Sequence, residues 1–294
     1  MQTAQIKTVK KLHSIQRSSG SHWVGNGFPV RTLFAYPNLG SVISPFLMLD
    51  YAGPAVFPPT QEKLGVGEHP HRGFETVSIV YSGEVTHRDS AGGGGTIGEG
   101  DVQWMTAASG LVHEEFHSAN FAKRGGRFEM VQLWVNLPAQ YKTAPPRYQS
   151  ISSEQIPVIH FPNGEGTARI IAGTLTGSHG PAETHTPLQV WDMRLNHKEA
   201  LQLPITDGHN AMLVLLSGSL QVDGTQLQTA EVALFDRVGN TLQIDHAKNA
   251  TLLLLSGEPL REPIVGSGPF VMNTPEEIRQ AISDYQQGKM GRLA

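Results

Sequence analysis

Two stretches with the same pattern lie 135 residues apart, and a duplication of this kind leaves few folds open. Residues 75–86 (ETVSIVYSGEVT) and residues 212–221 (MLVLLSGSLQ) each predict two short strands joined at a Ser-Gly pair, as in a hairpin. A similar turn that leads into a strand follows each stretch, near Gly100 and near Ala230. The chain is therefore interpreted as two copies of one β-rich unit.

The rest of the chain predicts an all-β protein. From about residue 30 to residue 137, short runs of Val, Ile, Leu and Phe alternate with Gly, Pro and Asp clusters, which is typical of brief strands and turns. With 32 Gly and 19 Pro, the chain is too rich in turn residues for a helical bundle. Residues 144–163 contain few periodic apolar residues and suit a connection. We expect two tandem β-barrel domains, at residues 1–145 and 146–294.

One helix is predicted at the C-terminal end. Thr274 can cap it, Pro275 occupies its first position, and Glu277 completes a capping box. Gly288 is placed to end it. An apolar stripe, which we expect to pack on a barrel, consists of Ile278, Ile282 and Tyr285.

Charge and cysteine content exclude several classes of protein. The net charge of -4 lacks the basic surface that direct nucleic-acid binding requires. Because the chain has no cysteine, a metal would have to be held by nitrogen and oxygen atoms. No stretch has the continuous apolar character of a secretion signal or a membrane span. We expect a soluble, untargeted, cytoplasmic protein.

Two pairs of alternating residues indicate a metal site. His69 and His71 flank a proline just before one predicted strand, and His113 and Glu115 follow another strand-like stretch. Alternate residues of an extended segment point to the same face, so each pair can direct two ligands into one barrel. Three imidazoles and a carboxylate suit Fe, Ni, Cu, Mn or Zn and leave a position open for water or substrate.

Chance is the alternative explanation, since a chain with 13 histidines contains such pairs without function. Two neighbouring pairs in one barrel favour metal binding. Glu75 competes with Glu115 as the carboxylate ligand, because it lies four residues after His71 and could also point inward. For His87, His117 and His209, ordinary polar roles are expected.

Three segments closely resemble the pirin family, and the resemblance extends over nearly the whole chain. They are GEHPHRGFETVSIVYSGEVTHRDS, GDVQWMTAASGLVHEEFHS and GPFVMNTPEEIRQAISDYQQGKMGR. The resemblance implies a bicupin fold with one iron ion, Fe(II). By position it implies the ligands His69, His71, His113 and Glu115, with Glu75 outside the ligand set.

The second copy departs from the ligand pattern. At the offset of 135 residues, His69 corresponds to Pro204 and His71 to Thr206, so one metal is predicted. The resemblance also implies an activity, the opening of flavonols such as quercetin by O2 with release of carbon monoxide, for which Glu115 could act as the base. A second role known in the family is that of an iron-containing regulatory partner of transcription factors or metabolic enzymes.

Overall fold

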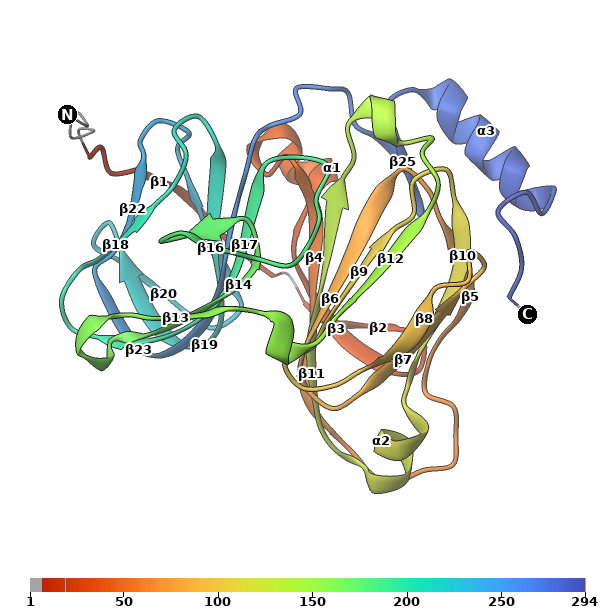
Figure 1. The fold of residues 1–294 in the computed structure, drawn as a ribbon, viewed down its shortest axis with the longest axis horizontal. Coiled ribbons are helices and arrows are strands. Elements are labelled where there is room, and N and C mark those ends of the chain that lie inside the picture. Colours follow the sequence, from red (N-terminus) through yellow and green to blue (C-terminus); the bar gives the residue numbers. More distant parts are fainter. Residues whose placement is uncertain (1–6, 19, 294) are drawn as a thin grey trace. The chain divides into compact units, whose positions relative to one another are not determined.

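The computed structural model describes residues 7–18 and 20–293, and most of them lie in β-strands (Figure 1). These residues form two compact units that interleave along the sequence. The N-terminal unit comprises residues 20–40, 45–155 and 260–293, and the C-terminal unit comprises residues 7–18, 41–44 and 156–259. The predicted all-β class with a helix near the C-terminus is confirmed.

The expected division between residues 145 and 146 does not coincide with these units, because segments near both ends of the chain belong to the other unit. Strand β1 (Leu12–Arg17) pairs with β21 (Glu231–Phe235) and therefore belongs to the C-terminal unit. Strand β12 (Arg147–Ile151), inside the expected connection, pairs with β9 (Val102–Thr106) in the N-terminal unit. Helix α3 (Pro275–Gln286) also belongs to the N-terminal unit. The physical reason is that an open sheet edge accepts any strand that reaches it, whatever its distance in sequence.

The N-terminal unit contains two antiparallel sheets, with the strand orders β12-β9-β6-β11-β4-β3-β2 and β5-β10-β7-β8. Phe28, Val80 and Phe128 of the larger sheet pack with Val85 and Ile97 of the smaller sheet, so an apolar core lies between the two sheets. The bounds of the further elements are β2 (His22–Val24), β3 (Phe28–Ala35), α1 (Tyr36–Leu39), β4 (Phe46–Phe57), β5 (Gly65–His71), β6 (Phe74–Ser82), β7 (Val85–Asp89), β8 (Gly94–Ile97), β10 (Leu111–His117), α2 (Ala119–Arg124), β11 (Gly126–Asn136), β24 (Val265–Ser267) and β25 (Phe270–Met272).

The C-terminal unit is built on one large sheet in the order β1-β21-β19-β23-β17-β14-β13, with β20 beside β19. Its interior is filled by apolar side chains such as Trp191, Leu213 and Leu254, each with no exposed surface. The bounds are β13 (Val158–His160), β14 (Gly166–Ala172), β15 (Thr174–Leu175), β16 (Ser178–His179), β17 (Leu188–His197), β18 (Leu201–Pro204), β19 (Asn210–Val222), β20 (Thr225–Leu227), β22 (Thr241–Ile244) and β23 (His246–Gly257).

The repeated Ser-Gly pair is a corner in both copies, and the prediction of two hairpins is wrong. Strands β6 and β7 follow each other in the chain but lie in different sheets. In the second copy, β19 continues through the pair as one strand with a bulge on each side of Ser217. Gly83 and Gly218 have φ angles of 91° and 77°, which redirect a strand without reversing it.

Helix α3 confirms the predicted capping box but not the predicted stripe. The Thr274 hydroxyl accepts the N–H of Glu277, and the Glu277 carboxylate accepts the N–H of Thr274. Ile278 is buried, whereas Ile282 and Tyr285 are 37% and 40% exposed. The buried face runs through Ala281 and Asp284 instead: Ala281 packs in an apolar cluster with Ile278, and Asp284 pairs with Arg72 at 2.8 Å. None of the helices within the described residues is long and apolar enough to cross a bilayer.

Candidate metal centre

Three histidines converge where β5 and β10 run side by side. The antiparallel register places His113 opposite His69, and alternation along β5 brings His71 to the same side. The ring centroid of His113 lies 4.2 Å from that of His69 and 4.8 Å from that of His71. One nitrogen from each ring lies within 4.8 Å of the others, so the three side chains form a group that could hold a metal ion. The expected convergence of these histidines is thus what the register produces.

The hydrogen bonds of the three rings leave one nitrogen of each ring free. His69 Nδ1 lies 2.8 Å from the carbonyl oxygen of Gly67, and His71 Nδ1 lies 3.4 Å from that of Pro269. Since a carbonyl oxygen only accepts, both Nδ1 atoms carry the proton and both Nε2 atoms offer a lone pair. His113 engages its Nδ1 as well, and its Nε2 is buried without a hydrogen-bond partner. This donor set fits a divalent transition metal.

The electrostatic environment favours neutral imidazoles. Burial, followed by the nearby His69, lowers the pKa of His71 to about 3. Burial, followed by the neighbouring His71 and His69, holds the pKa of His113 well below its ordinary value. Metal coordination requires an unprotonated nitrogen, and these rings offer one at neutral pH.

Glu115 faces the same interior from the next inward position of β10. It is buried, and its two carboxylate oxygens accept amide N–H groups from Gln103 at 3.3 Å and Gln132 at 2.9 Å. Glu115 forms a second possible metal group with His113 and His87, which shares His113 with the first group. Glu114, between His113 and Glu115, points the other way and pairs with Lys63 and Arg88.

Glu75, the competing carboxylate, is engaged elsewhere. It lies on β6 and accepts the hydroxyl of Thr106 at 2.7 Å. It is absent from both possible metal groups among the described residues. Burial raises the pKa of its carboxyl to about 7, against the opposing effect of the Thr106 hydrogen bond. The placement therefore sets Glu75 apart from the histidine cluster.

A row of polar side chains crosses the larger sheet behind Glu115. Cross-strand pairing aligns one residue from each of five neighbouring strands, and aligned pairs share one face of a sheet. The row is Thr32, Asp50, Gln132, Ser78 and Gln103. Two members of this row hold Glu115, which explains why glutamines occupy positions in an otherwise apolar barrel interior.

A cavity of about 340 Å³ opens onto His69, His71 and Glu115. Its walls are mostly apolar, with Val30, Met130 and Trp134 among the lining side chains. Asp50 is a carboxylate in this wall, and one of its oxygens accepts the Thr32 hydroxyl at 2.5 Å. An apolar cavity with a few polar groups at one end is the usual form of a small-molecule site.

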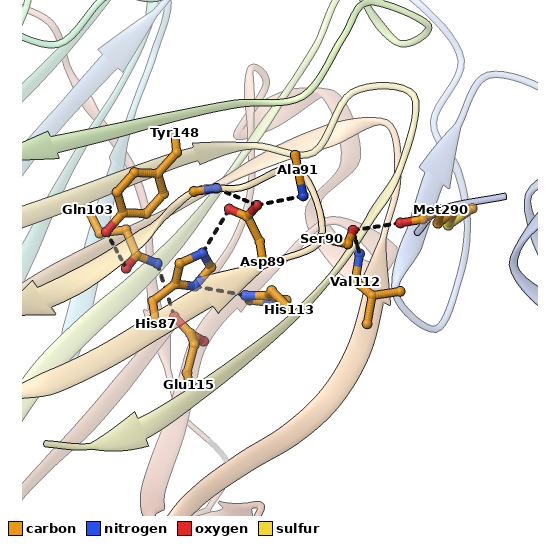
Figure 2. A network of polar contacts seen from close by, with 11 residues as sticks. His87, Asp89, Ser90, Ala91, Gln103, Val112, His113, Glu115, Tyr148 and Met290 are labelled. Carbon is orange, nitrogen blue, oxygen red and sulfur yellow. Dashed lines mark hydrogen bonds and ion pairs between the residues drawn. The ribbon is translucent and has the colours of Figure 1, made fainter. Parts of the chain in front are cut away.

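His87, for which only an ordinary polar role was predicted, lies against the histidine cluster. It lies on β7, beside β10, and its Nδ1 is 3.2 Å from Nδ1 of His113, while its Nε2 is 3.1 Å from Asp89 (Figure 2). Burial opposes ionisation of Asp89, but hydrogen bonds from His87, Gly93 and Ala91 outweigh it and lower the pKa of that carboxyl. His87 and Asp89 alternate on one strand as His69 and His71 do, and this third pair was the available sequence signal.

The other two histidines with expected polar roles contribute nothing to the cluster. His117 is buried among aromatic rings, 4.7 Å from Phe57 and 4.6 Å from Phe128 between centroids, and its Nε2 lies 3.0 Å from the carbonyl oxygen of Gly27. His209 lies in the C-terminal unit. Both are absent from the possible metal groups of the described residues.

Comparison with known proteins agrees with this fold. The Pirin family model matches residues 27–135, and the model of the Pirin C-terminal cupin domain matches residues 190–291. A Pseudomonas aeruginosa protein named "Putative quercetin 2,3-dioxygenase" is 55% identical over 97% of this chain and 99% of its own length. Pirin from Homo sapiens is 36% identical over 91% of this chain and 89% of its own.

A solved structure is also very similar. The crystal structure of quercetin 2,3-dioxygenase from Acinetobacter baumannii has a TM-score of 0.95 and 50% identity, over 98% of this chain and 100% of that one. The fold therefore defines a bicupin, a protein of two tandem cupin domains. Within that class, the chain belongs to the pirin family.

Proposed function

We propose that the N-terminal unit binds one divalent transition metal, Fe(II), through His69, His71, His113 and Glu115. The supporting observation is that three buried or half-buried imidazoles converge with their Nε2 lone pairs free. Neutral nitrogen and carboxylate donors suit Fe(II), and they suit Ni, Cu, Mn and Zn as well. Iron is chosen over these because the resemblance to pirins implies it.

We further propose that the protein is a dioxygenase that opens flavonols such as quercetin with O2 and releases carbon monoxide. Two relatives of 50% and 55% identity carry the name of this activity. The apolar cavity beside the histidines supports a flat aromatic substrate. A metal held there would supply Lewis-acid polarisation of the substrate's oxygen atoms.

Glu115 is proposed as the base that takes the proton of the flavonol hydroxyl. Its carboxylate lines the cavity, and the amides of Gln103 and Gln132 hold its two oxygens in place. Replacement by Gln keeps the shape and removes the basicity. Glu115→Gln should therefore lose turnover by a larger factor than it loses metal affinity. An equal loss of both would refute the role as base and leave Glu115 as a ligand only.

The deciding experiment is anaerobic reconstitution with Fe(II), followed by addition of quercetin and O2. Ring absorbance and carbon monoxide are followed together, with His69→Ala as the variant that lacks a ligand. We expect several turnovers per iron in the native chain and none in the variant. Iron binding without carbon monoxide would refute the dioxygenase and favour a regulatory, iron-containing binding protein. Failure of the native chain to bind any of the divalent metals would refute the site itself.

A further inference from the structure

Three buried side chains form an unbroken line that ends at the histidine cluster (Figure 2). Asp89 Oδ2 lies 3.1 Å from His87 Nε2, and His87 Nδ1 lies 3.2 Å from His113 Nδ1. The side chains of His87 and Asp89 are 0% and 1% exposed, so solvent offers them no substitute partners. Each contact joins two atoms of which one must donate a proton and the other must accept it.

The direction of every proton in this line follows from its first member. A carboxylate only accepts, so Nε2 of His87 carries the proton that Asp89 receives. The Nδ1 atom of a neutral His87 is then an acceptor, and Nδ1 of His113 must be the donor. The remaining nitrogen of His113, Nε2, is left without a proton, and it is the buried nitrogen without a hydrogen-bond partner.

We propose that Asp89 and His87 form a relay that fixes the tautomer of His113 and so positions its Nε2 lone pair for the metal. This proposal rests on the metal site proposed above. Asp89 and His87 are positioning residues, because they act on the metal only through His113. His69 and His71 obtain the same tautomer from backbone carbonyls of Gly67 and Pro269, whereas His113 obtains it from two side chains. Of the three tautomers, that of His113 is therefore the one that a side-chain substitution can reverse.

The relay is itself held in place at both ends. The other oxygen of Asp89, Oδ1, accepts the backbone N–H groups of Ala91 at 2.8 Å and Gly93 at 2.9 Å. The Tyr148 ring stacks on His87 with an angle of 10° between planes and 5.1 Å between centroids. Asp89 therefore cannot turn its two oxygens freely, and His87 cannot swing away from His113 without losing this stacking.

The fixed orientation of Asp89 makes Asp89→Asn an informative substitution. The two backbone N–H groups keep the amide oxygen of the introduced asparagine on their side, so its NH2 group faces His87. His87 Nε2 must then accept, its Nδ1 must donate to His113, and His113 must carry its proton on Nε2. That proton occupies the position the metal requires. His87→Gln is the opposite case, because a Gln amide can donate to Asp89 and accept from His113 with the native polarity.

The first measurement is Fe(II) affinity of the full chain, determined anaerobically by competition with a chelator. Asp89→Asn should bind Fe(II) at least ten-fold more weakly than the native chain, within the range of about 10- to 100-fold found for residues that orient metal ligands. His87→Gln should stay within a few-fold of it. Asp236→Asn is the matched control, since Asp236 accepts from His13 at 3.2 Å in the C-terminal unit, and its affinity should not change.

The second measurement reads the tautomers directly, by 15N NMR of the histidine rings in the metal-free chain. We expect His113 to be protonated on Nδ1 in the native chain and on Nε2 in Asp89→Asn. Native His113 protonated on Nε2, or unchanged affinity in Asp89→Asn, would overturn the relay. Equal loss of affinity in His87→Gln and Asp89→Asn would also overturn it, because His87 would then act as a ligand itself.

The two proposals fail in different ways. If the native chain binds no metal but shows the expected tautomers, the relay stands as a property of His113 and the metal site is refuted. If the native chain binds Fe(II) and Asp89→Asn binds it equally well, the metal site stands and the relay is refuted. Absence of carbon monoxide affects neither result, since neither measurement depends on turnover.

Discussion

Glu75→Gln should make the metal-free protein more stable, and the gain should grow with pH. Glu75 is almost fully buried, and burial raises the pKa of its carboxyl from 4.5 to about 7. A raised pKa means that the folded chain holds the proton more tightly than the unfolded chain. The corresponding stability is present below about pH 4.5 and is lost as the pH rises through about 7. A Gln side chain has no proton to lose and can still accept the Thr106 hydroxyl.

The size of the effect follows from the two pKa values. They differ by about 2.5, and each pH unit corresponds to about 1.4 kcal/mol, so the full effect is about 3.5 kcal/mol. Part of this destabilisation is already present at pH 5, because the carboxyl of Glu75 is largely ionised in the unfolded chain at that pH. The advantage of Glu75→Gln in free energy of unfolding should therefore widen by about 2.5 kcal/mol between pH 5 and pH 8.

Urea unfolding at pH 5, 6, 7 and 8 measures this difference. Glu62→Gln, at an exposed position of the same unit, is the control for removing a carboxyl from the surface. A constant difference between the native chain and Glu75→Gln across the four pH values would refute the reasoning. The reasoning would also be refuted if 13C NMR showed the carboxyl of Glu75 to titrate near pH 4.5.

Three further predictions test other features of the N-terminal unit. Lys142→Met should lower the free energy of unfolding by about 2 to 4 kcal/mol, measured by urea unfolding, because it leaves the acceptors Gly73 O, Asn136 Oδ1 and Val271 O unsatisfied. Thr274→Ala should destabilise helix α3 by about 1 kcal/mol and speed hydrogen exchange of its first-turn amides, whereas Thr274→Ser should not. Asp50→Leu should reduce the preference for quercetin over 3-hydroxyflavone, expressed as a ratio of kcat/KM, about tenfold, because a carboxylate in the cavity wall can accept a phenolic hydroxyl and leucine cannot. An unchanged ratio would show that Asp50 does not contact the substrate's hydroxyl groups.

Local patterns predicted which side chains of the site share one side of a strand. Alternation in His69, His71, His113 and Glu115 needs only an extended backbone, and an extended backbone is encoded by neighbouring residues. The cap at Thr274 was predicted for the same reason, since its partner Glu277 lies three residues away. Local patterns were less reliable where one motif serves two geometries. A Ser-Gly pair can turn a hairpin or bend a strand, and which it does depends on the sheet that receives the next residues.

The order of residues along the chain is enough to predict the all-β class and the duplication, and it indicates His69, His71, His113 and Glu115 as candidate metal ligands. Which strands are neighbours follows from the folded chain and not from these patterns. The order β5-β10-β7 brings His87 and Asp89 next to His113, and the larger sheet aligns Gln103 and Gln132 behind Glu115. The reason is physical: side-chain alternation is a property of one strand, whereas sheet order is set by long-range backbone hydrogen bonds that no local pattern records.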